Sequence, residues 1–401
     1  MKTSLGVIFG SKTCEHDVSI ITGLQAAMAA DPVQYDVTRI YISREGDWYI
    51  GDKLSDMTFF LDFDPTKVTR VLPAGEKGKL LLFEYPTEKK KLFGSGRNVL
   101  ASIDVVLPAV HGMNGEDGTL QGMLDLMNVP YASSGVMGCA VGMDKITMKS
   151  LFRGCGLPVL PDTWAERGEW ENDRDAVIAR AEEKVGYPMF VKPANLGSSI
   201  GISRAEDREG LIRAMDIAVS YDRRVLIEKG VTEIEEVNCS AMGYAGDVRI
   251  SETEMPIRWD DKELLDFSQK YLRGQGGKGM SALKRQIPAP VSEEKISEIR
   301  QLTARVFREM DCRGVVRIDY IIDKAEDKVY LGEINTIPGS LAFYLWEPVG
   351  VSFSQLIDAM VADAYKAWTD KNKSVFSYNS NILSAVRNGT KAAKMSSSEK
   401  K

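Results

Sequence analysis

Apolar and polar positions at the start of the chain alternate in a way that is typical of strands followed by helices. The apolar run Leu5 to Phe9 predicts a buried strand, and polar residues end it at once. An amphipathic helix is predicted from about Asp17 to Ala29, and a second strand from Tyr35 to Ile42. Strands that alternate with helices indicate a parallel sheet, so the chain is predicted to open with an α/β domain.

The alternation of predicted strands and helices stops after residue 50 and returns near residue 103. Residues 51–96 carry short alternating stretches with polar breaks, and they are predicted to form an insertion with little chemistry of its own. The near-continuous apolar run Ile103 to Val110 predicts a strand that is covered on both faces, and a helix is predicted from Thr119 to Met127. The N-terminal domain is therefore expected to span residues 1–143.

A central domain is expected from 144 to 248. A helix from about Asp144 to Arg153 is followed by the stretch 154–161, whose glycine and proline residues mark a boundary. The pattern then predicts one helix at 173–185 and three strands at 189–193, 224–229 and 236–242.

A C-terminal domain is expected from 249 to 370. Its glycine-rich stretch near 259–282 is predicted to be a mobile loop. A helix from Glu293 to Met310 is predicted to lead into two strands, Gly314 to Ile322 and Val329 to Asn335. Residues 371–401 lose periodicity and are rich in serine and lysine, so a flexible tail is expected.

Composition narrows the possible functions. The 51 basic and 57 acidic side chains give a net charge of -6, which argues against nucleic acid as the main partner. No apolar run approaches the length of about 18 residues that a membrane span needs. The five cysteines are scattered and only two histidines are present, so a reduced cytoplasm is the expected location and a zinc site is not expected.

The sharpest candidate site lies in the last two predicted strands. Arg317 and Asp319 lie two residues apart, as do Glu333 and Asn335, so each pair projects from one face of its strand. A hairpin that turns near Glu326 would set Asp319 opposite Glu333 and Arg317 opposite Asn335. Two carboxylates and an amide oxygen are ligands that Mg²⁺ uses when phosphates complete its coordination. A solvated strand face is the alternative.

Residues around this hairpin support the functional interpretation. Apolar side chains are predicted to cover the other face of the sheet, at Val315, Ile318, Ile321 and Ile334. A proline turn follows the second strand, and its Gly339 would let a backbone N–H approach a ligand as an oxyanion donor must.

Two segments in the central domain are typical of a nucleotide site. Lys192 ends a strand and precedes a glycine and serine loop at 197–199, which would present N–H groups and hydroxyls to phosphate oxygens. An ordinary surface turn is the alternative, and the loop matches neither the Walker A nor the Rossmann pattern. A purine could sit at the end of the strand that reaches Glu228, with Glu236 accepting from ribose hydroxyls, although the segment by itself could be only a buried strand.

Six segments, taken in order, resemble the D-alanine–D-alanine ligases of the ATP-grasp superfamily, over about residues 4–360. They are residues 10–19, 111–122 and 143–145, the loop after Lys192, Lys270 with Tyr271, and the hairpin of Arg317 and Glu333. The resemblance implies a three-domain ATP-grasp architecture of α/β and α+β type, with an N-terminal parallel-sheet domain that precedes the grasp. It also implies ATP and D-alanine as substrates, an acyl phosphate intermediate, a role in peptidoglycan synthesis and a homodimer.

The resemblance assigns roles to residues that bind ATP and metal. Phosphates would be held by Lys145, Lys192 and Lys270; adenine by Glu228 and the backbone of Lys229 to Val231; and ribose by Glu236. Two Mg²⁺ ions, with Mn²⁺ as a substitute, would be bound by Asp319, Glu333 and Asn335. These assignments agree with the site read from the hairpin itself.

The resemblance also assigns roles around the reacting groups. Glu15 would hold the ammonium group of the first D-alanine, and His111 would lie by its carboxylate. Ser198 and Tyr271 would join Glu15 in a hydrogen-bonded triad. Arg317 and the Gly339 N–H would meet the tetrahedral oxyanion. From the residues alone, Glu15 could instead be a helix N-terminal charge, and His111 a satisfied core histidine.

One position departs from the family pattern. Nine residues after Asn335, where the family has a serine that binds the second substrate's carboxylate, this chain has Tyr344. Tyr344 and the next residue, Leu345, are expected to contact the substrate. A tyrosine hydroxyl projects several Å further, so the acceptor pocket is expected to differ in shape. Ser340 or a backbone amide could take over the contact. Lys270 with Tyr271 favours an amine acceptor, with D-alanine expected and D-serine or another amino acid as the alternative.

Overall fold

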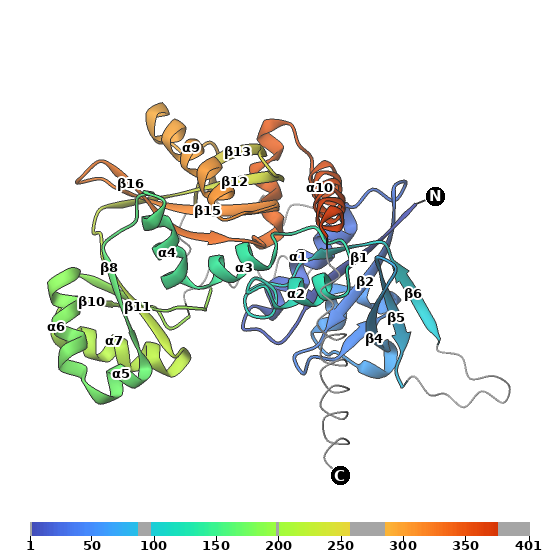
Figure 1. The fold of residues 1–401 in the computed structure, drawn as a ribbon, viewed down its shortest axis with the longest axis horizontal. Helices are drawn as coiled ribbons and strands as arrows, with labels where there is room; N and C mark the ends of the chain where they lie inside the picture. The colour runs from blue at the N-terminus through green and yellow to red at the C-terminus, as the bar shows by residue number, and fades with distance from the viewer. Residues whose placement is uncertain (1, 87–97, 198–199, 257–284, 376–401) are drawn as a thin grey trace, which may run out of the picture.

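The computed structural model describes residues 2–86, 98–197, 200–256 and 285–375. They form three sheets of seven, four and five strands, and each sheet carries its own helices. Figure 1 shows the three bodies, with the N-terminal sheet in blue, the central sheet in green and the C-terminal sheet in yellow and orange. The mixed α/β architecture predicted from the sequence is confirmed.

The N-terminal sheet has strands β1 (Thr3–Gly10), β2 (Tyr35–Ile42), β3 (Trp48–Ile50), β4 (Thr69–Glu76), β5 (Lys79–Glu84), β6 (Val99–Ile103) and β7 (Val105–Pro108), in the spatial order β6-β5-β4-β3-β2-β1-β7. β1 pairs in parallel with β2 and β7, whereas the remaining pairs are antiparallel. Helix α1 (His16–Ala29) packs on Leu5 and Phe9 of β1, and α2 (Thr119–Leu126) packs on Ile8. The central strand is therefore covered on both faces.

The described residues 51–86 of the predicted insertion are not a separate unit, because β4 and β5 extend the same sheet and bury Val71, Leu80 and Leu82. The apolar run from 103 to 110 is also not one strand, because Asp104 separates β6 from β7. The Asp104 carboxylate accepts a hydrogen bond from the Ser4 backbone N–H at 2.9 Å.

The central sheet has strands β8 (Asp162–Glu166), β9 (Met189–Pro193), β10 (Ser203–Ala205) and β11 (Arg224–Lys229), all antiparallel in the order β10-β9-β11-β8. Three helices accompany this sheet: α5 (Arg167–Asn172), α6 (Arg174–Lys184) and α7 (Arg208–Tyr221). β9 and β11 begin and end where the sequence predicted, because short apolar runs with sharp polar ends define them.

The C-terminal sheet has strands β12 (Ile234–Tyr244), β13 (Asp247–Pro256), β14 (Arg285–Gln286), β15 (Gly314–Asp323) and β16 (Lys328–Asn335), in the order β14-β13-β12-β15-β16. Helix α9 (Glu293–Glu309) covers one face, where Ile299 and Phe307 pack on Ile318. The strand predicted at 236–242 belongs to this sheet, so the C-terminal sheet begins at Ile234 rather than near residue 249.

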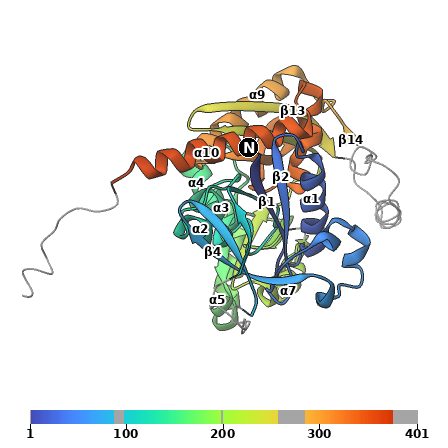
Figure 2. The same ribbon diagram turned by 90° about the vertical axis from the view of Figure 1, so that its right-hand side faces the viewer.

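Helices also connect the domains. α3 (Val136–Met143) and α4 (Lys145–Gly154) lead from the N-terminal domain towards the central one. α10 (Phe353–Lys373) begins at a capping box on Ser352 and was not predicted; it reaches into the segment expected to be a tail from residue 371. It lies between the N-terminal and C-terminal strands (Figure 2).

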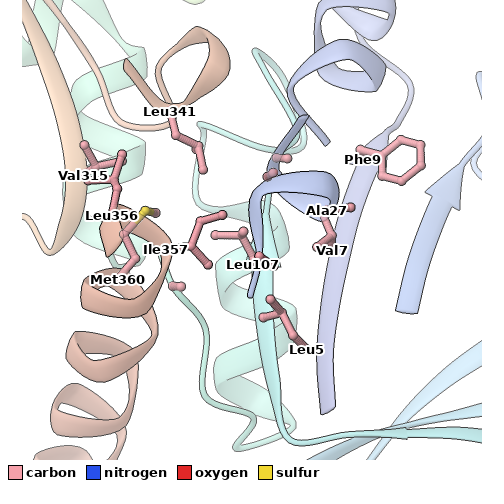
Figure 3. Close-up of a cluster of buried hydrophobic side chains, with 14 of the residues drawn as sticks. Leu5, Val7, Phe9, Ala27, Leu107, Val315, Leu341, Leu356, Ile357 and Met360 are labelled. Atoms are coloured by element: carbon pink, nitrogen blue, oxygen red, sulfur yellow. The ribbon is translucent and has the colours of Figure 1, made fainter. Parts of the chain in front are cut away.

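One hydrophobic core is shared by the N-terminal and C-terminal domains. It joins Leu5 and Leu107 of the N-terminal sheet to Ile357 of α10 and to Val315 of β15. Figure 3 shows Ile357 beside Leu107, with Val315 on the other side of α10 and Leu341 above the start of the helix. This packing fixes the end of β1 relative to the hairpin of β15 and β16, which carry the candidate site residues.

Candidate active site

The predicted hairpin is confirmed in its register. Asp319 pairs with Glu333 and Arg317 pairs with Asn335 across β15 and β16, and the turn between these strands contains Glu326. A register shift follows Asp319, so the strict alternation of side chains is interrupted there. The four polar side chains therefore share one face of the sheet, as the period of two predicts.

The apolar residues of the hairpin divide differently from the prediction. Ile318 and Ile334 pack against α9, as expected for the face away from the site. Val315 was predicted on that same face but lies in the core shared with α10. Val315 lies two residues before Arg317 on β15, so the two side chains project from the same face of the strand, the face that carries the site. Ile321, beyond the register shift, is not part of the core under α9.

Arg317 and Asn335 hold the Asp319 carboxylate. The Arg317 guanidinium donates through Nε and Nη2 to the two Asp319 oxygens at 2.7 and 2.8 Å. Asn335 Nδ2 donates to Asp319 Oδ2 at 3.1 Å. With Glu333 opposite, the face offers two carboxylates and one amide. Among the described residues no group of three or more His, Cys, Asp or Glu is arranged to hold a metal ion.

Lys145 connects the hairpin to the loop that follows β9. Asp144 caps α4 by accepting from the Thr147 N–H, which places Lys145 at the first helical position. The buried Lys145 ammonium donates to Leu196 O at 2.7 Å and lies 3.5 Å from Glu333 Oε2. Burial tends to raise the pKa of Glu333, but the positive charges of lysine and arginine neighbours lower it, so the carboxylate stays ionised.

Glu15 lies between two glycines from different domains. A Cβ atom at Gly112 would stand 2.6 Å from Glu15 Oε2, and one at Gly197 would stand 2.7 Å from the same oxygen. Both positions thus exclude a side chain while this carboxylate is in place. One pocket is lined by residues of all three domains, including Glu15, Glu116, Lys145, Gly197, Glu333 and Asn335. The glycine loop and the hairpin therefore converge.

A buried charge network lies beside Lys145. The Glu228 carboxylate accepts from Lys192 Nζ at 2.6 Å and forms an ion pair with Lys149 of α4. Burial would raise the pKa of Glu228, but the two ammonium charges outweigh it and lower the pKa to about 2. Glu228 was expected at the adenine, yet its carboxylate here fixes two lysines. Burial lowers the pKa of Lys192, but the charge of Glu228 outweighs this effect and raises the pKa, and the charge of Glu333 adds to the increase.

The other predicted nucleotide residues lie around the end of β11. Lys229 Nζ donates to Tyr187 O at 2.8 Å, which ties the strand end to the turn before β9. Val231 lies in the connection from β11 to β12, and Glu236 projects from β12. Ser198, Lys270 and Tyr271 lie outside the described residues.

His111 uses both ring nitrogens within the protein. Its Nε2 lies 2.7 Å from Thr22 Oγ1, which also accepts from the Ser340 N–H at 3.0 Å. The other nitrogen meets the backbone of Ile337, and burial lowers the pKa of His111 to about 4, only partly opposed by that hydrogen bond. The prediction placed His111 by a substrate carboxylate. In the structure it is a neutral ring that ties β7 and α1 to the segment after β16.

We expect the imidazole of His111 to stay neutral down to about pH 5. Because the unfolded state takes up a proton near pH 6.5 and the folded state does not, folding stability falls as the pH drops from 6.5 to 4, by roughly 3 kcal/mol. The chain has two histidines, so NMR titration of two imidazole signals measures this directly. The signal that remains in His16→Asn belongs to His111, and titration of that signal near pH 6.5 would contradict the expectation.

The segment after Gly339 has an unusual backbone. Ser340, Leu341 and Ala342 all have φ between 51° and 53°, which is the left-handed region that non-glycine residues rarely adopt. Contacts from α1 hold this turn, because Ser340 Oγ donates to Gln25 Oε1 at 2.6 Å. Leu345 was predicted to contact substrate, but its side chain is fully buried in the shared core.

Tyr344 forms a hydrogen bond within the protein. Its hydroxyl donates to Glu254 Oε1 at 3.1 Å, and the side chain is buried. The sequence left open whether this hydroxyl, Ser340 or a backbone amide contacts the second substrate. In the structure the hydroxyl is committed to Glu254 of β13.

Sequence reasoning missed Thr22, Lys149 and Glu116. Glu116 accepts from the backbone N–H groups of Gly112 and Ile337 at 2.9 and 3.0 Å, and burial raises its pKa to about 7. Its place within the segment 111–122 was a usable signal. Thr22 and Lys149 gave none, because helical residues of these types are common and their partners lie far away in the sequence.

No helix in the described part of the chain combines the length and the apolar character that crossing a bilayer requires.

Two family models match most of the chain. The model described as D-ala D-ala ligase N-terminus matches residues 4–134, and the model described as D-ala D-ala ligase C-terminus matches residues 151–362. The D-alanine–D-alanine ligase of Thermosipho africanus is 35% identical over 383 residues, covering 95% of this chain and 98% of the relative. That of Bacillus cytotoxicus is 35% identical over 376 residues, covering 93% and 98%.

Solved structures share the fold. The D-alanine–D-alanine ligase from Coxiella burnetii has a TM-score of 0.75 at 24% identity, covering 93% of this chain and 96% of that one. A D-Ala:D-Ser ligase from Enterococcus faecalis has a TM-score of 0.72 at 23% identity, covering 91% and 100%.

Proposed function

This chain belongs to the D-alanine–D-alanine ligase family, and we propose that it joins two D-alanine molecules into D-alanyl-D-alanine for peptidoglycan synthesis. As a member of that family it is an ATP-dependent ligase that forms a peptide bond. The observation that carries the proposal is the meeting of Glu15, Lys145 and Glu333, from three parts of the chain, around one pocket.

In the first step Glu15 holds the ammonium group of the donor D-alanine. A carboxylate oxygen of the donor attacks the γ-phosphorus of ATP, and ADP leaves as an acyl phosphate forms. Lys145, which lines the pocket, and Lys192, which interacts electrostatically with Glu333, are proposed to neutralise phosphate charge. Backbone or carboxylate oxygens hold both ammonium groups. Lys270 is proposed to reach the γ-phosphate.

The nucleotide base is proposed to lie at the end of β11. The backbone of Lys229 and Val231 would hydrogen-bond adenine, and Glu236 would accept from the ribose hydroxyls. Glu228 supports this site through Lys192, which it holds by an ion pair. Its carboxylate therefore orients a phosphate ligand rather than the purine.

Asp319, Glu333 and Asn335 are proposed to hold two Mg²⁺ ions, for which Mn²⁺ would substitute. The bound ions would supply positive charge to the phosphates during transfer. The donor set fits such ions because it contains only oxygens and leaves several ligand positions to phosphate and water. Arg317 and Asn335, which bond to Asp319, orient its carboxylate.

In the second step the acceptor amine, after losing a proton, attacks the acyl phosphate carbonyl, and phosphate leaves. Arg317 and the Gly339 N–H are proposed to stabilise the oxyanion, at about 3 kcal/mol per donor. The glycine-rich loop that contains Tyr271 is proposed to close over the site through a hydrogen-bonded triad of Tyr271, Ser198 and Glu15. Closure would exclude water, which would hydrolyse the intermediate. His111 and Ser340 are proposed to position the turn that carries Gly339, through Thr22.

Two further statements about the protein are proposals. The enzyme is proposed to act in the cytoplasm, where ATP is available and its five cysteines stay reduced. It is also proposed to form a homodimer through the N-terminal domain, as the family resemblance implies.

A different acceptor is the second candidate function. Tyr344 stands where the family pattern has a serine, and its hydroxyl bonds to Glu254, so the acceptor pocket is rebuilt. D-serine or another amino acid would then replace the second D-alanine. D-alanine as donor and the acyl phosphate step would be unchanged.

Mass spectrometry of products tests both candidates at once. Enzyme, ATP and Mg²⁺ are incubated with a mixed pool of D- and L-amino acids. We expect D-alanyl-D-alanine together with ADP and phosphate. D-alanyl-D-serine as the main product would support the second candidate, and ATP turnover without any D-alanyl dipeptide would refute both.

A further inference from the structure

A second polar cluster adjoins the hairpin through β12 and β13. Across the C-terminal sheet, Asp319 pairs with Asn238, which in turn pairs with Glu254 on β13. The carboxylate row of the hairpin therefore continues for two more strands. Asn238 Nδ2 donates to Glu254 Oε1 at 3.0 Å, the same oxygen that accepts from the Tyr344 hydroxyl. Both Glu254 and Tyr344 interact electrostatically with Arg317.

Arg285 completes this cluster. Its guanidinium carbon lies 3.6 Å from the centroid of the Tyr344 ring, a cation–π contact. Its Nη1 lies 3.1 Å from Glu254 Oε2 as an ion pair. The side chain of Arg285 is only 11% exposed, and its Nε forms no hydrogen bond with any described residue, while Nη1 has only the ion pair with Glu254. A buried donor without a hydrogen-bond partner is costly, so this arrangement suits a ligand that brings acceptor oxygens.

We propose that Arg285 binds the carboxylate of the acceptor amino acid. It would replace the serine hydroxyl of the family pattern, which is absent here because that position holds Tyr344. A guanidinium matches a carboxylate because it donates two parallel hydrogen bonds. Glu254 and the Tyr344 ring fix the plane of the guanidinium, one by charge and one by stacking. Arg317, which bonds to Asp319, is then left to serve the oxyanion. The inference rests on the proposed function, and it requires an acceptor with a free carboxylate.

A competition between two acceptors tests this role. D-alanine serves as the donor and as one acceptor, while D-alaninamide, which lacks a carboxylate, can act only as acceptor. Mass spectrometry separates the dipeptide from the dipeptide amide, and their ratio reports the preference for a carboxylate. We expect wild-type enzyme to favour the dipeptide, and Arg285→Ala to reduce that preference by about 10- to 100-fold, the cost of losing charge-assisted hydrogen bonds.

Arg300→Ala is the matched control. Arg300 pairs with Glu252, two residues from Glu254 on the same strand, but reaches it from α9 on the far side of the sheet. Its product ratio is expected to match wild type. Arg285→Lys keeps the charge without the two parallel donors, so it should show an intermediate loss, and it decides the question if Arg285→Ala does not fold.

The outcomes distinguish a failure of the role proposed for Arg285 from a failure of the proposed ligase function. A product ratio for Arg285→Ala within twofold of wild type, while the wild type makes dipeptide, would overturn the role of Arg285 alone. Formation of neither product by the wild type would overturn the proposed function, and this inference with it. A reduced preference in Arg285→Ala with an unchanged ratio in Arg300→Ala supports the inference.

Discussion

Glu333→Ala is expected to lose more than about 100-fold of the Mg²⁺-dependent ligase activity, because even partners outside the direct metal ligands cost 10- to 100-fold. Stability should stay near wild type, since the Glu333 side chain is 41% exposed and its ion-pair partner Lys145 lies 3.5 Å away. Steady-state ADP release and thermal melting measure the two effects separately.

Glu326→Ala provides a control from the same hairpin. Glu326 lies in the turn between β15 and β16, exposed and paired with Lys328 at 2.9 Å. An exposed pair of this kind contributes little to stability, and the turn is remote from the pocket. Its activity should match wild type. Wild-type activity in Glu333→Ala would show that the metal assignment is wrong.

Glu228→Gln is expected to cost about 3–5 kcal/mol of folding free energy, because it leaves two buried ammonium groups without their shared counter-charge. Lys149 and Glu228 are almost fully buried, so water cannot screen the repulsion. In the wild type, the ion pairs of Glu228 with its two lysines stabilise the fold fully above about pH 4.3. This stabilisation is lost as the pH falls towards 2, the pKa of Glu228 in the folded state. Urea denaturation at neutral pH gives the change in free energy directly.

Glu235→Gln serves as the control for this prediction. Glu235 lies on β12 and pairs with Lys324 at 3.2 Å near the surface. Its replacement should change the unfolding free energy by less than about 1 kcal/mol. A similarly small change in Glu228→Gln would mean that the two lysines do not depend on Glu228, and its proposed support of the phosphate site would fail.

Local patterns predicted the hairpin well. Side chains in a strand alternate with a period of two, and a short polar turn joins β15 to β16. These two facts fix the pairing of Asp319 with Glu333 from sequence alone. β9 and β11 could be predicted from the sequence equally well, because each is a short apolar run with polar ends.

Pairings between distant segments could not be predicted in this way. β12 joins the C-terminal sheet through β15, about 80 residues further along the chain, and no local pattern records that partner. The same holds for Tyr344 and Glu254, whose hydrogen bond spans 90 residues. The substrate role of His111 came from the family resemblance alone, and its partner Thr22, 89 residues away, could not be found from local sequence.

Anomalous scattering from crystals grown with ADP and Mn²⁺ tests most directly whether the hairpin is the metal centre. Manganese peaks within coordination distance of Asp319, Glu333 and Asn335 are predicted, with the nucleotide phosphates beside Lys145 and Lys192. Bound ADP with manganese elsewhere, and none of these three side chains as a ligand, would contradict the proposed chemistry.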